Sequence, residues 1–310
     1  MKVFINSLGS ISAQKTFDNT GFLEEVVSYD ETVIHAIDPV YKDYIPPAAA
    51  RRMAKGIKMG VAASKIALNE AGLENVDAII TGTGMGCVID SEKFVSAIID
   101  NNEEYLTPTS FIQSTHNTVG GQIALGMDCK GYNFTYVHSS NSFESALLDA
   151  LMQLENDEAT TILVGGVDEL GEHTTRIHKL AHHVKEYTEN SLKILQSNTK
   201  GAIFSEGANF FVLSTEKQED SYAEVCTIEI YNTLPKSDLT DTVLTFLQEN
   251  DIALEELDLV VMGNNGDVEY DGFYNTLSEG IFKDIPQAYY KHLCGEFNTA
   301  SAFGVWLASK

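Results

Sequence analysis

The chain has 310 residues, enough to bury a large core in one domain or in two closely packed halves. Its net charge of −25 argues against binding to nucleic acid or to an anionic membrane surface. No apolar run approaches the length of a membrane span, and no basic and apolar leader precedes the first expected strand, so we expect a cytoplasmic protein without membrane insertion.

The order of predicted elements indicates an α/β fold. Apolar strands are expected at residues 2–8, 77–82, 134–137, 161–165, 208–214, 222–231 and 257–262. Helices are expected at residues 51–71, 91–100, 118–125, 142–154 and 238–248, and near the C-terminus. Strands without polar alternation that alternate with helices predict a parallel or mixed sheet buried between helical layers.

A weak internal repeat suggests a duplicated half. Residues 67–82 match residues 246–263, because both read as a helix end, a short turn, an Asp, an apolar strand and a Gly. We therefore predict an N-terminal half at residues 1–220 and a C-terminal half at residues 221–310, packed as one body because no low-complexity linker separates them.

Residues 135–150 predict a strand, a tight Ser/Asn turn and a helix. Such an elbow is a common place for a nucleophile, because the turn exposes one side chain and the helix N-terminus stabilises its anion. His138 stands at the tip, where acyl-transfer chemistry requires Cys or Ser. Ser139 and Ser140 follow it, but no His/Asp relay that could activate them is evident, so turn and helix-capping roles are expected.

Five stretches, in this order across nearly the whole chain, resemble β-ketoacyl synthases of the thiolase-like fold. The resemblance implies a layered αβαβα architecture built from two duplicated halves. Its motifs are Arg-Arg-Met-Ala-Lys-Gly at 51–56, Ile-Ile-Thr-Gly-Thr-Gly-Met-Gly-Cys at 79–87, Val-Gly-Gly-Val-Asp-Glu at 164–169, Phe-Ser-Glu-Gly-Ala at 204–208 and Lys-His-Leu-Cys-Gly-Glu at 291–296.

The resemblance also implies which residues stand at the catalytic positions. The family uses a Cys as acyl acceptor and two His residues to decarboxylate and condense a malonyl unit on a carrier protein. By the motifs, the Cys position falls on His138 and the second His on Glu296, whereas the Lys before it is kept as Lys291. The loop of the first His contains Asn264 and Asn265 and no His.

These three replacements should abolish condensation. Imidazole is a poor stable acyl acceptor, and a carboxylate at Glu296 would repel a developing enolate. The pattern resembles chain-length-factor subunits, which pair with an active ketosynthase and help to shape its acyl tunnel. The resemblance implies a heterodimer through the strand near residues 134–137, or a homodimer. It also implies an acidic acyl carrier protein that docks on the partner rather than on this acidic chain.

Two alternatives remain open at the level of the sequence. The chain could be a working acyltransferase or decarboxylase with a remodelled site that uses His138 with Glu296. It could also be a homodimeric acyl-binding pseudoenzyme. Family members usually continue through further strands beyond the position of Lys310, so either the fold is trimmed or the sequence is incomplete.

The remaining candidate residues are given structural roles. We expect His138 to be a buried His that fills the former Cys pocket, and Cys294 and Cys87 to be core thiols, although Cys294 could replace the nucleophile. Phe204, Asn264, Asn265 and Cys294 are expected to line the acyl pocket beside Ser139 and Ser140.

No cofactor or metal ion is expected. The four cysteines lack a Cys-x-x-Cys pair, which favours free thiols in a reducing compartment. His173, His178, His182 and His183 are expected to form a solvated helix face rather than a zinc site. The loop at 267–272 lacks the closing Glu of a calcium loop, and the glycines at 82–86 lack dinucleotide-binding spacing.

Overall fold

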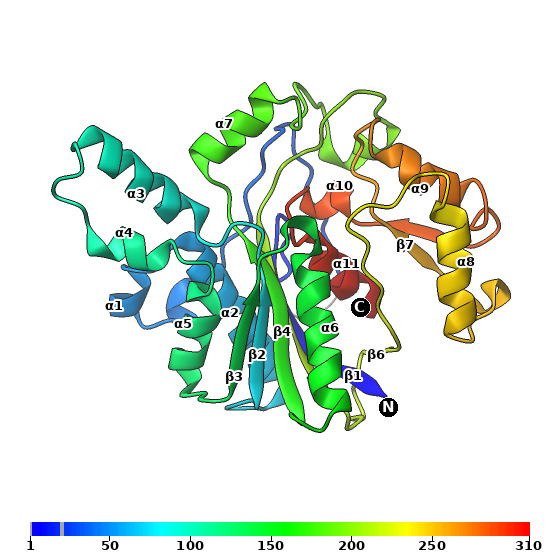
Figure 1. Cartoon of the computed structure of the whole chain (residues 1–310), viewed down its shortest axis with the longest axis horizontal. Helices are drawn as coiled ribbons and strands as arrows, with labels where there is room; N and C mark the ends of the chain where they lie inside the picture. The colour runs from blue at the N-terminus through cyan, green and yellow to red at the C-terminus, as the bar shows by residue number, and fades with distance from the viewer. Residues whose placement is uncertain (1, 19–21) are drawn as a thin grey trace.

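A six-stranded mixed sheet forms the centre of the computed structural model, which describes residues 2–18 and 22–310 (Figure 1). Its strands are β1 (Val3–Ile11), β2 (Ala78–Gly82), β3 (Tyr132–Tyr136), β4 (Thr161–Asp168), β5 (Gly207–Ser214) and β6 (Ala223–Val225). They lie in the order β3-β2-β4-β5-β1-β6. The strands β3, β2 and β4 are mutually parallel, whereas β5 runs antiparallel to β4 and β1, and β6 runs antiparallel to β1. The expected mixed sheet is confirmed.

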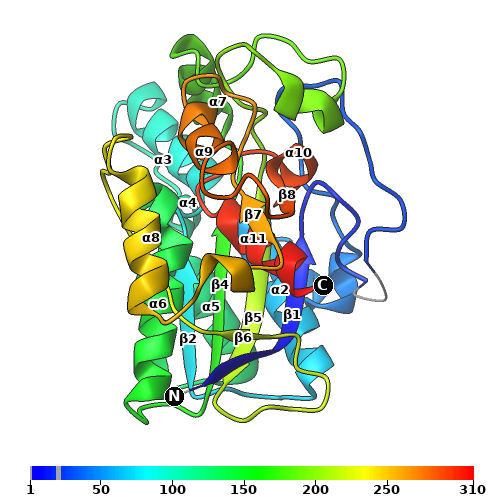
Figure 2. The same ribbon diagram turned by 90° about the vertical axis from the view of Figure 1, so that its right-hand side faces the viewer.

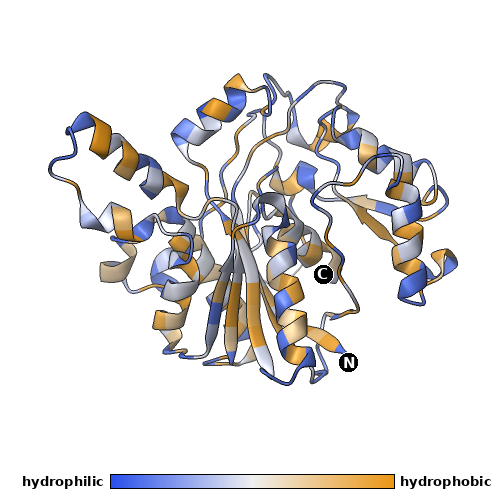
Figure 3. Ribbon diagram, in the orientation of Figure 1, coloured by the Kyte–Doolittle hydropathy of each residue, from blue (hydrophilic) through white to orange (hydrophobic). Residues whose placement is uncertain are grey.

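Helices cover both faces of this sheet. The two faces carry separate apolar clusters, since neighbouring residues such as Phe210 and Phe211 of β5 belong to different clusters. On one face lie α2 (Lys55–Ala71) and α5 (Thr118–Met127), and on the other lie α6 (Ser142–Glu155) and α11 (Ala300–Ser309). Figure 2 shows α11 across the sheet, and Figure 3 shows apolar residues along the central strands. Burial on both sides explains why these strands lack polar alternation.

The other elements form an arm, a covering helix and a small lobe (Figure 1). The arm consists of α3 (Val88–Asp100) and α4 (Pro108–Gln113), near the short α1 (Pro47–Ala50). Above the carboxyl ends of the central strands lies α7 (Glu172–Leu180). The lobe holds the parallel pair β7 (Val260–Met262) and β8 (Gln287–Tyr289), with α8 (Leu239–Glu249) and α9 (Asp271–Ser278). The short α10 (Lys291–Cys294) leads from the lobe to α11.

Some predicted boundaries are wrong. The strand expected at 222–231 is only three residues long, because its antiparallel register pairs Val225 with Val3, the first residue of β1, and leaves no partner strand beyond. The helix expected from residue 51 begins at Lys55, after Ala54 as N-cap. The second copy of the repeat does form a helix, a turn and a strand, but β7 pairs with β8 in a separate sheet.

Both predicted halves contribute to the central body. From the second half, β6 pairs with β1, and α11 packs against β5. The division at residue 220 stays a prediction. No helix among residues 2–18 and 22–310 is both long and apolar enough to cross a membrane. The four cysteines are all free thiols.

The contact between β1 and α2 depends on Gly9. A Cβ atom at this position would overlap the backbone carbonyl oxygen of Ala63 in α2. We predict that Gly9→Ala lowers the free energy of unfolding by about 1–3 kcal/mol, because a helix backbone must move to admit the methyl group. The matched control is Gly121→Ala in α5, where no atom lies within 4 Å of the added Cβ. Its higher helix propensity should raise stability by up to about 1 kcal/mol. Chemical denaturation measures both, and equal effects would contradict this account.

Candidate functional site

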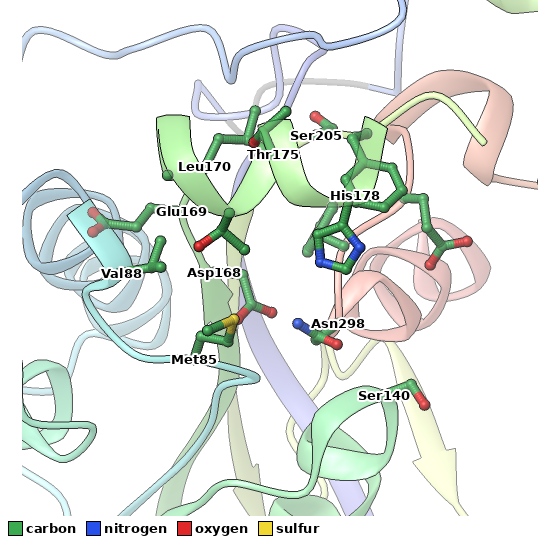
Figure 4. A pocket seen from close by; sticks show the side chains of 15 residues that line it. Met85, Val88, Ser140, Asp168, Glu169, Leu170, Thr175, His178, Ser205 and Asn298 are labelled. Carbon is green, nitrogen blue, oxygen red and sulfur yellow. The ribbon is translucent and has the colours of Figure 1, made fainter. Parts of the chain in front are cut away.

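Two adjoining cavities lie beyond the carboxyl ends of the parallel strands, where ligands commonly bind in open α/β sheets. The inner cavity has a volume of about 140 Å³ and lies under α7 (Figure 4). The outer pocket, of about 620 Å³, opens toward the small lobe and its residues Tyr270, Phe273 and Tyr274. Ser140, His178, Phe204 and Glu296 line both and therefore form their common boundary.

A charged network forms one wall of the outer pocket. The Lys291 Nζ donates hydrogen bonds to both carboxylate oxygens of Glu296, at 2.8 Å and 3.0 Å. The Asn265 Nδ2 donates to the Glu296 Oε2 at 2.6 Å. The structure therefore brings together Glu296, Lys291 and Asn265, three residues that the sequence resemblance assigns to the catalytic region.

Backbone hydrogen bonds hold Glu296 in this position. Its N–H donates to the Ile203 carbonyl at 2.7 Å, and its carbonyl accepts from the Ser205 N–H at 2.9 Å. Gly295 precedes it with a φ of +74°, and a Cβ there would overlap the side chain of Ser205. Because an L side chain disfavours this φ and finds no space, the Gly before Glu296 is required for the bridge.

The Asn265 loop is held from two sides. The Asp271 carboxylate at the start of α9 accepts the N–H groups of Asn265, at 2.9 Å, and Gly266, at 3.0 Å. The Lys185 Nζ donates to the Gly266 carbonyl at 2.8 Å. The Asn265 amide is therefore presented to Glu296 by a fixed loop.

The ion pair also controls the charge of Lys291. Burial by itself would lower the pKa of this ammonium, but the Glu296 carboxylate, together with Tyr290 and Tyr274, raises the pKa above its ordinary value. Lys291 is therefore charged at neutral pH, and Glu296 is the group that stabilises this charge most.

The strand–turn–helix elbow is confirmed by β3, its turn and α6. The Ser142 Oγ accepts the N–H of His138 at 2.8 Å and donates to the Ser139 carbonyl at 2.7 Å, which closes the turn. Ser139 lies at the tip with a φ of +54°, a strained value for a residue with a side chain. Its Oγ donates to the Asn298 Oδ1 at 3.2 Å, and the next residue, Ser140, lines both cavities.

The expectation of a buried His138 is wrong. His138 is exposed in the single chain and lines neither cavity. Its Nδ1 lies 3.3 Å from the Ser145 Oγ on α6, because the turn directs the imidazole along the outside of that helix. The structure thus places Ser139, not the expected His138, at the tip of the turn, and it brings Ser140 rather than His138 to the cavities.

Three predicted lining residues lie outside both cavities, namely Ser139, Asn264 and Cys294. Cys294 is fully buried in the core between the sheet and α11, where burial raises the pKa of its thiol, so the interpretation as a core Cys is confirmed. Asn264 is buried and donates to the Asn275 Oδ1 of α9 at 3.1 Å. Cys87 is likewise a buried core thiol. Of the other predicted lining residues, Phe204 and Asn265 face the outer pocket.

His178 lines both cavities, a role that its sequence pattern did not predict. This His is half-buried, its ring lies 5.0 Å from that of Phe204, and its Nδ1 is 3.0 Å from the Nδ1 of His183. The expected solvated position therefore fails for His178 alone, since His173 on the helix and His182 and His183 after it are exposed. The available signal was the spacing of Thr174, Thr175 and His178 on one face of a helix. Among the described residues, no three His, Cys, Asp or Glu side chains group as metal ligands.

Buried carboxylates form the floor of the inner cavity. Asp168 accepts the N–H groups of Gly84, at 2.7 Å, and Thr299, at 2.8 Å, which joins the end of β4 to the loop before α11. Glu169 accepts the N–H of Ile89 at 2.9 Å, and burial raises the pKa of Glu169 to about 7. Both carboxylates have internal donors and hold the cavity walls together.

Comparison with known proteins identifies the family. The family model described as the N-terminal domain of β-ketoacyl synthases matches residues 14–219, which is more than half of the chain. The chain belongs to the β-ketoacyl synthase family, and its fold is thiolase-like. The expected family and fold class are therefore confirmed. No curated protein matched the chain in the sequence comparison.

Solved structures of similar fold include synthases and their partner subunits. The ishigamide ketosynthase/chain length factor superposes with a TM-score of 0.79 at 17% identity, over 99% of this chain and 85% of that one. A β-ketoacyl synthase from Burkholderia phymatum STM815 gives 0.77 at 17% identity, with 99% and 85% coverage. A ketosynthase in complex with its chain length factor from Xenorhabdus doucetiae gives 0.75 at 14% identity, with 99% and 84% coverage. At these identities the likeness shows the fold alone.

The ion pair makes a testable contribution to stability. Glu296→Gln keeps the shape but removes the charge, and we predict a loss of about 1.5–3 kcal/mol in the free energy of unfolding, the range for hydrogen bonds to charged groups. Because the pKa of Lys291 is raised, the pair keeps stabilising the fold until the pH rises above the ordinary Lys range. The difference in unfolding free energy between Glu296→Gln and the unmodified chain should therefore stay constant between about pH 7 and pH 9.

Glu224→Gln is the matched control for this measurement. It breaks the surface pair of Glu224 with Lys2, which has the same 2.8 Å separation but is mainly exposed, and it should cost less. Denaturant titrations at both pH values compare the two variants. An equal loss of unfolding free energy in both variants would show that the Lys291–Glu296 pair contributes no more to stability than a surface ion pair.

Proposed function

We propose that this chain is a non-condensing subunit of the chain-length-factor type, which acts beside an active ketosynthase in fatty acid or polyketide synthesis. The observation that carries the proposal is the Lys291–Glu296–Asn265 network. In it, the Glu296 carboxylate, at the position that the resemblance assigns to a substrate-donating His, already accepts hydrogen bonds from Lys291 and Asn265.

The chemistry of condensation needs groups that the site does not present. An acyl acceptor must be activated by a base, and donors must stabilise the charge on the malonyl-derived enolate. At the elbow, the Ser139 hydroxyl donates to an amide oxygen rather than to a base, and His138 faces Ser145. The Glu296 carboxylate has no proton to donate and would repel an enolate. Because Glu296 lines both cavities and His138 lines neither, the geometry gives no support to an acyltransferase that uses these two residues together.

The exposed edge of the sheet supports a subunit interface at β3. Tyr132, Phe134 and Val137 are all exposed in the single chain, and the Phe134 ring packs between those of Tyr132 and Tyr136. An apolar edge strand with free backbone groups favours pairing with another chain unless it is covered. Chains of the same fold are described as a ketosynthase with its chain length factor, which supports a related synthase as the partner.

The charge of the chain bears on the carrier protein. One solved neighbour is described as a ketosynthase in complex with an acyl carrier protein. Because carrier proteins are acidic and this chain carries a net charge of −25, long-range repulsion disfavours it as the sole docking platform. We propose that the carrier docks mainly on the active partner.

Association can be tested with the β3 edge. We predict that co-expression with an intact Cys-His-His synthase from the same biosynthetic gene set yields a stable 1:1 complex. Phe134→Asp should weaken it by at least about 10-fold, since a charge at the centre of an apolar interface costs on the order of a few kcal/mol. Leu259→Asp, which alters an equally exposed apolar side chain outside the edge, should leave the complex intact. Light scattering measures both, and a chain that stays homodimeric beside the synthase would refute the heterodimer.

A decarboxylation assay tests whether the chain is catalytically inactive by itself. We predict that the purified chain releases no carbon dioxide from malonyl-carrier protein above the uncatalysed background, and that His138→Ala changes nothing. The complex with the active synthase should condense. Decarboxylation by the isolated chain that is lost in His138→Ala would instead establish the remodelled enzyme.

A further inference from the structure

The helix α7 covers the inner cavity but is weakly attached to the body. Its residues Thr174, Thr175 and His178 line the cavity, and Figure 4 shows His178 extending from this helix toward Asn298. No residue of α7 is buried, and its apolar side chains Ile177 and Leu180 are exposed. Core packing therefore does not fix this helix in place.

Two polar attachments hold the ends of α7. At its N-terminus, the Glu92 carboxylate of α3 accepts the N–H groups of Thr174, at 2.7 Å, and His173, at 3.1 Å. Near its C-terminus, the His178 Nδ1 meets the Nδ1 of the exposed His183 at 3.0 Å, beside a backbone hydrogen bond from the His183 N–H to the His178 carbonyl, and the His178 ring packs on Phe204. The His183 carbonyl accepts the Ala202 N–H at 2.9 Å, which ties this end of the helix to the body. The first attachment is a carboxylate, and the second is a pair of imidazoles.

We propose that α7 is a lid whose latch is the His178–His183 pair, and that protonation of both imidazoles releases it. The proposal goes beyond the function proposed above, because it concerns access to the inner cavity and holds whether or not the subunit condenses. Since His178 also stands on the boundary of the outer pocket, release of the lid would join the two cavities.

The proton count of the pair explains the release. A hydrogen bond between two Nδ1 atoms needs one nitrogen with a proton and one with a lone pair. The neutral pair and the singly protonated pair both meet this condition, whereas two imidazolium rings present two protons to each other. Burial, followed by the neighbouring His183, lowers the pKa of His178. The closed state is therefore favoured above the ordinary His pKa and loses this advantage as the pH falls below it.

Other titratable groups surround the latch and must be separated from it. They are Glu296 with Lys291, Asp267, Tyr270 and Tyr274 of the outer pocket, Asp168 and Glu169 of the cavity floor, His182 with Glu186 and Lys185 after the helix, and Glu172, His173, Arg176 and Lys179 on α7 itself. Glu92 stays ionised in the relevant range, because the donated N–H groups lower its pKa despite the effect of burial. Glu169, with a pKa of about 7, is the strongest competing sensor.

Hydrogen exchange of α7 tests the lid in the full chain. The exchange rates of amides 172–180, corrected for their intrinsic pH dependence, are compared at about pH 7.5 and about pH 5.5. We expect opening to increase about 2- to 10-fold at the lower pH, the factor that one net hydrogen bond supplies. The exchange of α2 amides, measured in the same samples, reports global unfolding and should not change.

Variants assign the effect to the latch. His178→Phe keeps a ring against Phe204 but cannot titrate, so its α7 exchange should be independent of pH. His173→Gln, an exposed position on the same helix, should behave like the unmodified chain. If His178→Phe misfolds, His183→Phe gives the same test from the other partner. A pH-independent unmodified chain overturns the proposal, as does a pH response that persists without the imidazole, which would assign the switch to Glu169.

Discussion

The ion pair between Lys291 and Glu296 is the interaction on which the candidate site depends. It joins three segments that are distant in the sequence, because Glu296 is also bound through its backbone to residues 203–205 and through its carboxylate to Asn265. A largely buried charge without its partner would be strongly destabilising, so the folded position of each of these segments depends on the others. The shape of the outer pocket follows from this assembly.

The central sheet supplies the frame for that assembly. The parallel strands β3, β2 and β4 end at the same edge, and this places the elbow, the Gly84 turn and the Asp168–Glu169 carboxylates around one cavity. Antiparallel β5 begins at the same edge, and the segment before it bridges to Glu296. The small lobe with β7 and β8 then closes the outer pocket from the side.

Much of the fold could be predicted from the sequence, because buried strands and amphipathic helices leave local patterns. The positions of β2, β4, α6 and α8 follow from such patterns. The candidate site was predicted less well. His138 was expected to be buried, but a turn closed by Ser142 directs it outward, and no local pattern encodes that direction. His178 was missed because the Phe204 ring on which it packs and the cavities that it lines come from distant segments, which become neighbours only after folding.

The network also explains why Glu296 and Asn265 belong together. A carboxylate at position 296 beside an unaltered His loop would gain Lys291 as a partner but would lose the second donor that Asn265 provides to the Oε2 atom. With Asn265 in place, the Glu296 carboxylate has its hydrogen-bond donors, its charge balances that of the Lys291 ammonium, and the site is stable without a substrate. On the proposed function, a rigid pocket wall requires Glu296 and Asn265 together, whereas condensation would require donors to the substrate at both positions.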